Sequence, residues 1–433
     1  MSSDSVSEVN STSTSPQDIS KKKSQQLQRL TVVLDPGTSL SKILYVVNDG
    51  TVQWMTMGAE SLTLPATSAS SLPIDNGMGF PEDNAWVRLN KAGECHLLGF
   101  VASNYRATTS IKKLKHESLL FKILGTIGAI ASREKLGSSF DLELGVLLPL
   151  NEYRLAASRE ADIKSALASF YFQDKRLRVK LRDFLVMPEG YGTAKYCHRE
   201  DENNSFKSAQ TAILMLGYRN TSCLFFRRGT VSLSESGTTD LGFYTLIDKL
   251  IEKIPHLKRE DILRAIKIEF SESRAPSSQH NNQFTYSEEW AAIDWSAFTS
   301  SKQSFSERQE LEDSFKNIYE LCLAEYWCLL KNWLDEILPQ TQEIDAFIFT
   351  GGSYDLLQFL LNNYANSLSA SSSHTYAYDE LKKYLLWRDA MGKERFMREN
   401  LAMRFADAWG FFVDFANYDL KKILDRNTGE VIK

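Results

Sequence analysis

The sequence predicts an α/β fold made of two similar halves that face each other. Short apolar runs typical of buried strands alternate along the chain with longer stretches of helical periodicity. Residues 33–44 and residues 214–226 also resemble each other, since each reads as an apolar strand, a turn of small residues and a second apolar strand. Glycine in such a turn lets the backbone approach a ligand closely, and turn amides and hydroxyls can hold anionic oxygens. A ligand between the halves would touch both turns, although each turn taken alone is typical of an ordinary hairpin.

The composition is that of a globular protein large enough for two or three domains. The chain has 433 residues, of which 43% are hydrophobic, and its formal net charge of −5 argues against a generally basic nucleic-acid-binding protein. Its five cysteines are odd in number and scattered, which favours a reducing cytoplasm over a disulfide framework. The most apolar stretch, residues 119–131, is too short to cross a membrane and contains Lys122. We therefore expect a cytoplasmic protein without a membrane partner.

The first half is expected to follow a flexible tail. Residues 1–29 are rich in serine and poor in apolar side chains, so burial cannot offset the entropy of ordering them. Residues 60–85 lack a clear pattern and are expected to form a loop. The expected strands cover residues 30–34, 42–47, 51–57, 141–148 and 176–186, with two short strands within 86–98. The expected helices cover residues 117–131 and 152–170.

The second half is expected to repeat this mixture of strands and helices. Its expected strands cover residues 211–216, 222–226, 230–234 and 346–350. Its expected helices cover residues 241–254, 258–269 and 307–338, and a further helix covers 398–414. Residues 271–305 read as a mobile insertion and residues 367–374 as a serine-rich loop. We expect domain I to span residues 30–205, with residues 385–433 packing back on it, and domain II to span residues 206–384.

With the two hairpins, a Pro-Glu-Gly turn at 188–190 and a Thr-Gly-Gly turn at 350–352, the chain from Leu30 to Phe415 resembles the actin, Hsp70 and sugar-kinase superfamily. Within it, the chain is most similar to plasmid-segregation actins of the ParM and StbA type. This resemblance implies two ribonuclease-H-like halves around a nucleotide cleft that holds ATP and Mg²⁺. It also implies head-to-tail filaments that move plasmid DNA through a DNA-binding adaptor protein, without direct contact between the chain and nucleic acid.

The segment 35–42 (DPGTSLSK) resembles the first phosphate motif of that superfamily. The resemblance implies that Asp35 faces Mg²⁺ through water, which suits an ion that keeps several waters. Gly37, Thr38 and Ser39 would offer amides and hydroxyls to the phosphates, and Lys42 would offer a positive charge. The alternative is an Asp-Pro-Gly turn followed by a solvated lysine.

The segment 186–190 (VMPEG) resembles the first connection between the halves, where the family places a glutamate that orients the attacking water. Glu189 is therefore our candidate for the catalytic residue, together with Asp35. Phosphoryl transfer depends on positioning and charge stabilisation, so one well-placed carboxylate matters. The alternative is an exposed glutamate in a turn.

The segment 215–221 falls where the second phosphate motif should be, and there the sequence departs from the family pattern. Gly217, Asn220 and Thr221 would contact phosphate, but the usual aspartate is replaced by Met215. This departure puts the rate of hydrolysis in doubt more than it does nucleotide binding. Arg219, in the same turn, is a further candidate phosphate contact.

Two later segments resemble the nucleoside-binding motifs. Asp240 and Gly242 would lie near the ribose, although Asp240 could equally be an ordinary helix N-cap. Gly351 and Gly352 end a buried strand, and without side chains they would let the backbone lie flat under the base. The alternative is a strand-to-helix turn that needs glycine for its geometry. Residues 405–410 resemble the late helix that joins the halves.

Two other functions remain open for this sequence. A nucleotide-dependent sensor or scaffold that hydrolyses weakly or does not polymerise is favoured by Met215. A small-molecule kinase of the same superfamily would need an aspartate acting as base in the cleft, for which no convincing motif is present. The chain has no GxxxxGK[ST] loop, so a P-loop enzyme is excluded.

Overall fold

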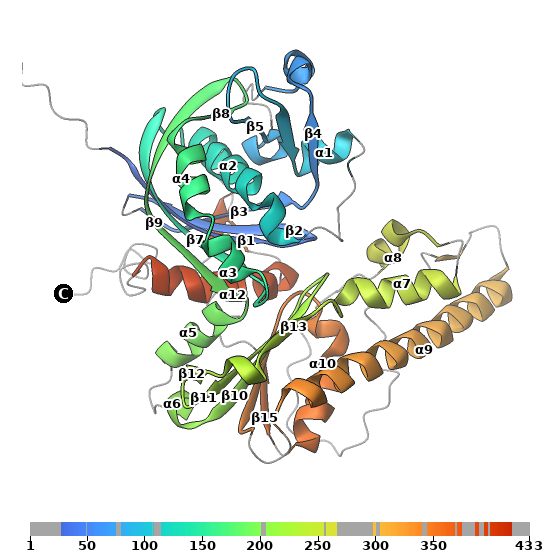
Figure 1. Cartoon of the computed structure of the whole chain (residues 1–433). Coiled ribbons are helices and arrows are strands. Elements are labelled where there is room, and N and C mark those ends of the chain that lie inside the picture. The colour runs from blue at the N-terminus through green and yellow to red at the C-terminus, as the bar shows by residue number, and fades with distance from the viewer. Residues whose placement is uncertain are drawn as a thin grey trace, which may run out of the picture.

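The computed structural model describes most of the chain between residues 27 and 417. The described residues are 27–48, 50–74, 79–105, 107, 114–200, 205–254, 257–265, 298–299, 304–339, 344–368, 370–374, 386–388, 394–396 and 399–417. The expected tail up to residue 26 and all but residues 298, 299, 304 and 305 of the expected 271–305 insertion lie outside them. Figure 1 shows two bodies, one above the other, with helix α12 running between them.

Within the described part of the chain, nine strands form the sheet of the first half, in the order β3-β2-β1-β7-β9-β8-β5-β6-β4. β1 and β2 form an antiparallel hairpin, and β7 pairs with β1 in parallel. The strands are β1 (Arg29–Pro36), β2 (Leu40–Val47), β3 (Gln53–Gly58), β4 (Ser61–Leu64), β5 (Trp86–Arg88), β6 (Cys95–Leu98), β7 (Ser139–Leu148), β8 (Phe170–Phe172) and β9 (Lys175–Pro188).

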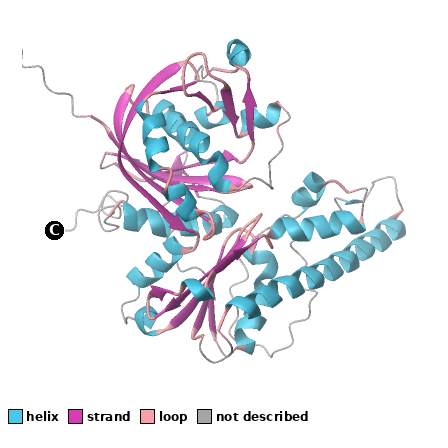
Figure 2. Ribbon diagram, viewed as in Figure 1, coloured by secondary structure: helices cyan, strands magenta, loops and turns pink. Residues whose placement is uncertain are grey.

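Helices cover both faces of this sheet, which explains why β1 is buried along nearly its whole length. On β1, Leu30, Val32 and Leu34 belong to the core shared with α2, whereas Val33 packs with Trp409 of α12. Figure 2 shows the curved sheet (magenta) wrapped around α2 and α4. The helices of this half are α1 (Phe100–Asn104), α2 (Lys115–Arg133), α3 (Tyr153–Ala157) and α4 (Glu160–Ala168), with 3₁₀ turns at Ala66–Ser71 and Pro81–Asn84.

The second half repeats the central unit of the first. β10 and β11 form an antiparallel hairpin, and β14 pairs with β10 in parallel, as β7 does with β1. The sheet order is β12-β11-β10-β14-β15, with β13 pairing to β11. Its strands are β10 (Gln210–Leu216), β11 (Thr221–Arg227), β12 (Thr230–Val231), β13 (Gly237–Thr239), β14 (Ala346–Thr350) and β15 (Ser371–His374). The similarity of the two hairpins expected from the sequence is therefore present in the structure.

Helices also cover the second sheet. One face packs against α7 (Phe243–Lys253), α9 (Phe305–Ile337) and α10 (Tyr354–Ser367), and α8 (Arg259–Ala265) follows α7. The other face packs against α5 (Tyr191–Glu200) and α6 (Ser205–Ser208). α9 begins with a capping box between Ser304 and Glu307, which satisfies backbone donors at its start.

Two crossing helices join the halves. α12 (Glu399–Phe415) packs on β1, β2 and β7 and crosses α5 in close backbone contact. A Cβ atom built on Gly192 would lie 1.8 Å from the carbonyl oxygen of Asp407, and one built on Gly410 would lie 2.0 Å from that of Gly192. Only glycine fits at these two positions. A small hairpin of β16 (Leu386–Arg388) and β17 (Glu394–Phe396) precedes α12.

Four local expectations were wrong. The expected strand 230–234 ends at Val231, and Leu233–Glu235 form a 3₁₀ turn. The expected loop 60–85 contains β4 and two 3₁₀ turns, because β4 pairs with β6, which follows much later in the chain. The expected helix 152–170 is divided into α3 and α4 at residues 158–159, and Phe170 starts β8. Part of the expected serine-rich loop 367–374 is β15, which pairs with β14. No helix among the described residues is long and apolar enough to span a membrane.

Candidate functional site

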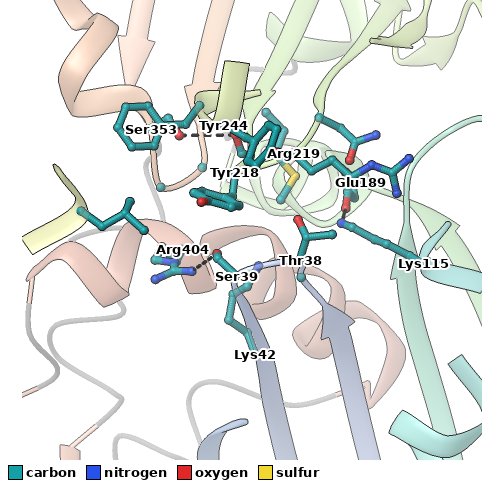
Figure 3. A pocket seen from close by; sticks show the side chains of 18 of the residues that line it. Thr38, Ser39, Lys42, Lys115, Glu189, Tyr218, Arg219, Tyr244, Ser353 and Arg404 are labelled. Atoms are coloured by element: carbon teal, nitrogen blue, oxygen red, sulfur yellow. Dashed lines mark hydrogen bonds and ion pairs between the residues drawn. The ribbon is translucent and has the colours of Figure 1, made fainter. Parts of the chain in front are cut away.

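A cavity of about 670 Å³ lies where the two hairpin turns approach each other. Both halves line it, as do Lys115 of α2 and Arg404 of α12. Figure 3 shows Lys115 reaching Glu189 on one side of the cavity and Arg404 reaching Ser39 on the other. Ten of the residues expected from the sequence line the cavity: Gly37, Thr38, Ser39, Lys42, Glu189, Gly217, Arg219, Asn220, Gly351 and Gly352.

The β1–β2 turn forms one wall of the cavity. The amide of Gly37 donates to the carbonyl oxygen of Asp35 at 2.9 Å, and a Cβ atom at Gly37 would lie 2.3 Å from the carbonyl oxygen of Leu40. Asp35 and Lys42 are cross-strand partners, and Lys42 Nζ donates to Asp35 Oδ2 at 2.5 Å. Lys42 is only 7% exposed, so the alternative of a solvated lysine is wrong. Burial lowers the pKa of Lys42, and the Asp35 carboxylate offsets only part of that effect.

Asp35 lies beneath the cavity rather than on its surface. Its side chain is fully buried, and its Oδ1 has no hydrogen-bond partner. A buried acceptor without a partner costs free energy unless a further group donates to it. A water molecule of a hydrated Mg²⁺ ion is such a donor, so Asp35 fits the role expected for it. No cluster of three or more His, Cys, Asp or Glu that could enclose a metal occurs among the residues that the structure describes.

Glu189 lies at the end of β9, where it faces the cavity. Its backbone amide donates to the carbonyl oxygen of Leu148 at 2.8 Å, and the residue is only 4% exposed. The alternative of an exposed turn glutamate is therefore wrong. Its Oε1 accepts from Lys115 Nζ, and its Oε2 accepts from Ser222 Oγ at 3.2 Å. Burial by itself lowers the pKa of Lys115. The carboxylates of Glu189 and Asp35 outweigh this effect, so the pKa of Lys115 is raised.

The β10–β11 turn forms the opposite wall. The amide of Gly217 donates to the carbonyl oxygen of Asn220 at 2.9 Å, so the turn is closed by backbone contacts. Asn220 is buried and its Oδ1 has no hydrogen-bond partner. Met215 lines the cavity beside this turn and offers no carboxylate there. This turn thus provides a second unsatisfied acceptor at the cavity, besides Asp35 Oδ1.

Three expected residues support the second turn from outside the cavity lining. Thr221 is fully buried, and its hydroxyl donates to the carbonyl oxygen of Leu241 at 2.7 Å. The amide of Gly242 donates to the carbonyl oxygen of Arg219 at 3.0 Å. The Asp240 side chain is 79% exposed, and its carboxylate lies 3.5 Å from Arg219. These positions favour a structural role over direct contact with a ligand in the cavity.

The glycine turn after β14 lies against the end of β10. Gly351 has φ of +98°, and a Cβ atom there would lie 2.4 Å from the carbonyl oxygen of Leu216. Ser353 continues this contact, because its amide donates to the same carbonyl at 3.2 Å. Gly352 lies under Arg404, whose Cγ would be 3.1 Å from a Cβ atom at Gly352. The turn thus needs glycine both for its backbone geometry and for space.

The sequence did not indicate the aromatic side of the cavity. Tyr218 and Tyr244 lie edge to face, with ring centroids 6.0 Å apart. The Arg259 guanidinium stacks 4.0 Å from the Tyr244 ring centroid and pairs with Asp248. Phe243, Leu263 and Leu356 complete this apolar side. Such a surface suits a flat aromatic group, because rings and guanidinium planes stack favourably. Only the position of Tyr218, next to Gly217, could have indicated it.

Basic side chains outnumber acidic ones in the lining of the cavity, and four of the five basic ones are paired with carboxylates. Its basic lining residues are Lys42, Lys115, Arg219, Arg259 and Arg404, and its acidic ones are Glu60 and Glu189. Arg404 Nη2 donates to Ser39 Oγ at 2.7 Å, so a cation of α12 lies directly at the first turn. Burial lowers the pKa of Arg404, and Asp35 opposes that effect. The arrangement favours a ligand that combines several negative charges with a flat ring.

Solved structures of actin homologs are similar to this chain. An archaeal actin homolog has a TM-score of 0.56 at 13% identity, and the match covers 90% of this chain and 100% of that one. A Bacillus thuringiensis ParM hybrid protein with ADP, which contains two ParM mutants, has a TM-score of 0.53 at 14% identity, covering 92% and 49%. A 15-stranded ParM filament from Clostridium botulinum gives a TM-score of 0.50 at 12% identity, covering 90% and 99%. No protein-family model and no curated protein sequence matches the chain.

These likenesses concern the fold, because the identities are low. The fold class expected from the sequence is confirmed: this chain has an actin-like α/β fold of two halves around a cleft.

Proposed function

We propose that the chain binds ATP with Mg²⁺ in the cleft and assembles head to tail into filaments that segregate DNA. The observation that supports nucleotide binding is that one cavity is lined by both hairpin turns, by five basic side chains and by an aromatic side. A nucleoside triphosphate has the matching combination of several negative charges and a flat base. A ParM hybrid with ADP shares the fold, which supports the choice of nucleotide.

The cleft residues divide between the two ends of this ligand. The phosphates would face the two hairpin turns together with Lys42 and Arg404, since charge-assisted hydrogen bonds are the stronger ones. The base would lie against Tyr244 and the residues around it. Asp35 Oδ1 would accept from a water of Mg²⁺, which when bound neutralises charge on the phosphates. Glu189 would orient the attacking water.

Filament assembly and its cellular role are further parts of the proposal. A head-to-tail contact that does not close into a ring produces a filament. A ParM filament shares the fold at low identity, which supports self-association of this chain. We extend to it a cytoplasmic role in plasmid segregation, with a DNA-binding adaptor protein and without direct contact to DNA or membrane.

A second candidate function is favoured by Met215. This side chain takes the place of the aspartate expected in the second phosphate motif, and it lines the cavity. Without that carboxylate, the chain would bind nucleotide as a sensor or scaffold and hydrolyse it slowly or not at all. Binding of ATP without assembly would identify this function.

Titration with ATP in the presence of Mg²⁺ tests the proposed site. We expect the wild-type chain to bind ATP, and we expect Arg404→Ala to raise the Kd about tenfold, because one charged contact to the phosphates is lost. Arg182→Ala is the matched control, since Arg182 is an exposed arginine paired with Asp141, and its Kd should equal that of the wild type. Absence of ATP binding by the wild-type chain would contradict the proposed function.

A further inference from the structure

The cleft contains a buried ion pair that the sequence analysis did not anticipate. Lys115 Nζ donates to Glu189 Oε1, and the two side chains are 7% and 5% exposed. Glu189 is the residue proposed above to orient water, so this inference rests on the proposed function. Figure 3 shows the Lys115 side chain extending directly to Glu189.

Lys115 is held in place by the start of its own helix. The Glu152 carboxylate accepts at one oxygen, Oε2, from the backbone amide of His116 at 2.9 Å, and the His116 ring nitrogen lies 3.0 Å from the same oxygen. Arg159 donates to the carbonyl oxygen of His116 at 3.0 Å. Glu152 is only 1% exposed, so the first turn of α2 is fixed from inside the protein. The ammonium of Lys115 therefore reaches Glu189 from a defined position.

Both carboxylate oxygens of Glu189 already accept a hydrogen bond. Oε1 accepts from Lys115, and Oε2 accepts from Ser222. On the opposite side of the cavity, Met215 provides no second carboxylate that could accept the hydrogen bond from the attacking water instead. A carboxylate in contact with an ammonium directs its charge at the cation instead of at an attacking water.

We propose that Lys115 is a positioning residue that slows ATP hydrolysis by holding Glu189 in this ion pair. In the reaction, the water oxygen bonds to the γ-phosphorus, and the bond from that phosphorus to the β–γ bridging oxygen breaks. ADP leaves with the electron pair of that bond. One proton of the water remains on the released phosphate, and the other passes to Glu189 and then to solvent. The proposal concerns how readily Glu189 can accept the hydrogen bond from this water.

Single-turnover phosphate release from bound Mg-ATP tests the proposal. Lys115→Met should raise the rate constant about tenfold or more, within the range typical of acid–base groups, while the Kd for ATP changes less than about threefold. Lys115→Arg keeps a cation at the pair and should retain the slow wild-type rate. Such a split between rate and affinity, with retention in the arginine variant, would not result from a purely structural role.

Two further variants keep the test decisive. Lys115→Gln retains a hydrogen-bond donor without the charge, so it should release phosphate faster even if the methionine variant fails to fold. Lys122→Met is the matched control, because Lys122 is a buried lysine of the same helix that does not line the cavity. Its rate should equal that of the wild type.

The outcomes separate this inference from the proposed function. An unchanged or lower rate in folded Lys115→Met and Lys115→Gln proteins that still bind ATP would overturn the restraint by Lys115 and leave the nucleotide site intact. Failure of the wild-type chain to bind ATP would overturn the proposed function, and this inference with it.

Discussion

At the scale of single residues, the cleft combines groups that neighbouring sequence positions fix with groups that arrive from far away. Asp35 and Lys42 are cross-strand partners in one hairpin, so their contact follows from local pairing. Lys115 and Arg404 belong to helices α2 and α12, and they reach the cleft only through the packing of those helices. The sequence therefore predicted the two turns and Glu189, but not Lys115 and Arg404 beside them.

The buried carboxyl group of Asp407 leads to a prediction about how the free energy of unfolding depends on pH. It accepts at 2.8 Å from the amides of Gly190 and Thr193, and it is buried where α12 crosses α5. Burial raises its pKa to about 6 from the usual 3.8, although the two amides oppose the shift. Between about pH 4 and 6 the folded state holds a proton that the unfolded state releases. The contribution of Asp407 to the free energy of unfolding should therefore fall as pH rises through this window and stay constant above it.

Urea unfolding of the wild type and of Asp407→Asn at pH 4, 5, 6 and 7 measures this contribution. The difference between the two free energies of unfolding should change by up to about 3 kcal/mol between pH 4 and 6, and then level off. Two curves that run parallel over this window would show that Asp407 does not titrate there.

At the scale of elements, the local sequence pattern was sufficient to predict strands and turns where burial and turn chemistry agree. The β1–β2 and β10–β11 hairpins consist of apolar strands around turns that contain glycine, and both were predicted. β15 was missed because its sequence, Ser-Ser-Ser-His, has no apolar alternation, and its strand conformation comes from parallel pairing with β14. β4 likewise depends on a partner strand more than thirty residues away. Such pairings are tertiary and leave no local signal.

The close crossing of α5 and α12 leads to a prediction about the stability of glycine variants. Gly192→Ala would place a methyl group 1.8 Å from the carbonyl oxygen of Asp407, so the helices must separate. We expect this variant to lower the free energy of unfolding by about 2 to 3 kcal/mol. Gly137→Ala is the matched control, because its Cβ atom would meet nothing closer than 3.8 Å and should change stability by less than about 0.5 kcal/mol. Equal stability of the two variants in urea unfolding would contradict close packing at the crossing.

At the scale of the whole molecule, the nucleotide would lie between two hairpin turns that belong to different halves. A ligand that contacts both turns can change how the halves sit on each other only if it binds one arrangement more tightly. Filament assembly that depends on ATP would indicate that ATP binds one arrangement of the halves more tightly. The sequence pattern predicted the two halves, but the surfaces for self-association have no local signal in it.

Light scattering and phosphate release, recorded together after adding Mg-ATP to the purified full-length chain, test the central claim most directly. We predict that scattering rises with ATP and not without nucleotide, and that phosphate appears later and slowly, because Lys115 restrains Glu189. Decay of scattering should follow phosphate release, and Glu189→Gln should assemble without decaying. Scattering that stays flat at ATP concentrations that saturate the site would contradict the filament and leave a nucleotide-binding sensor.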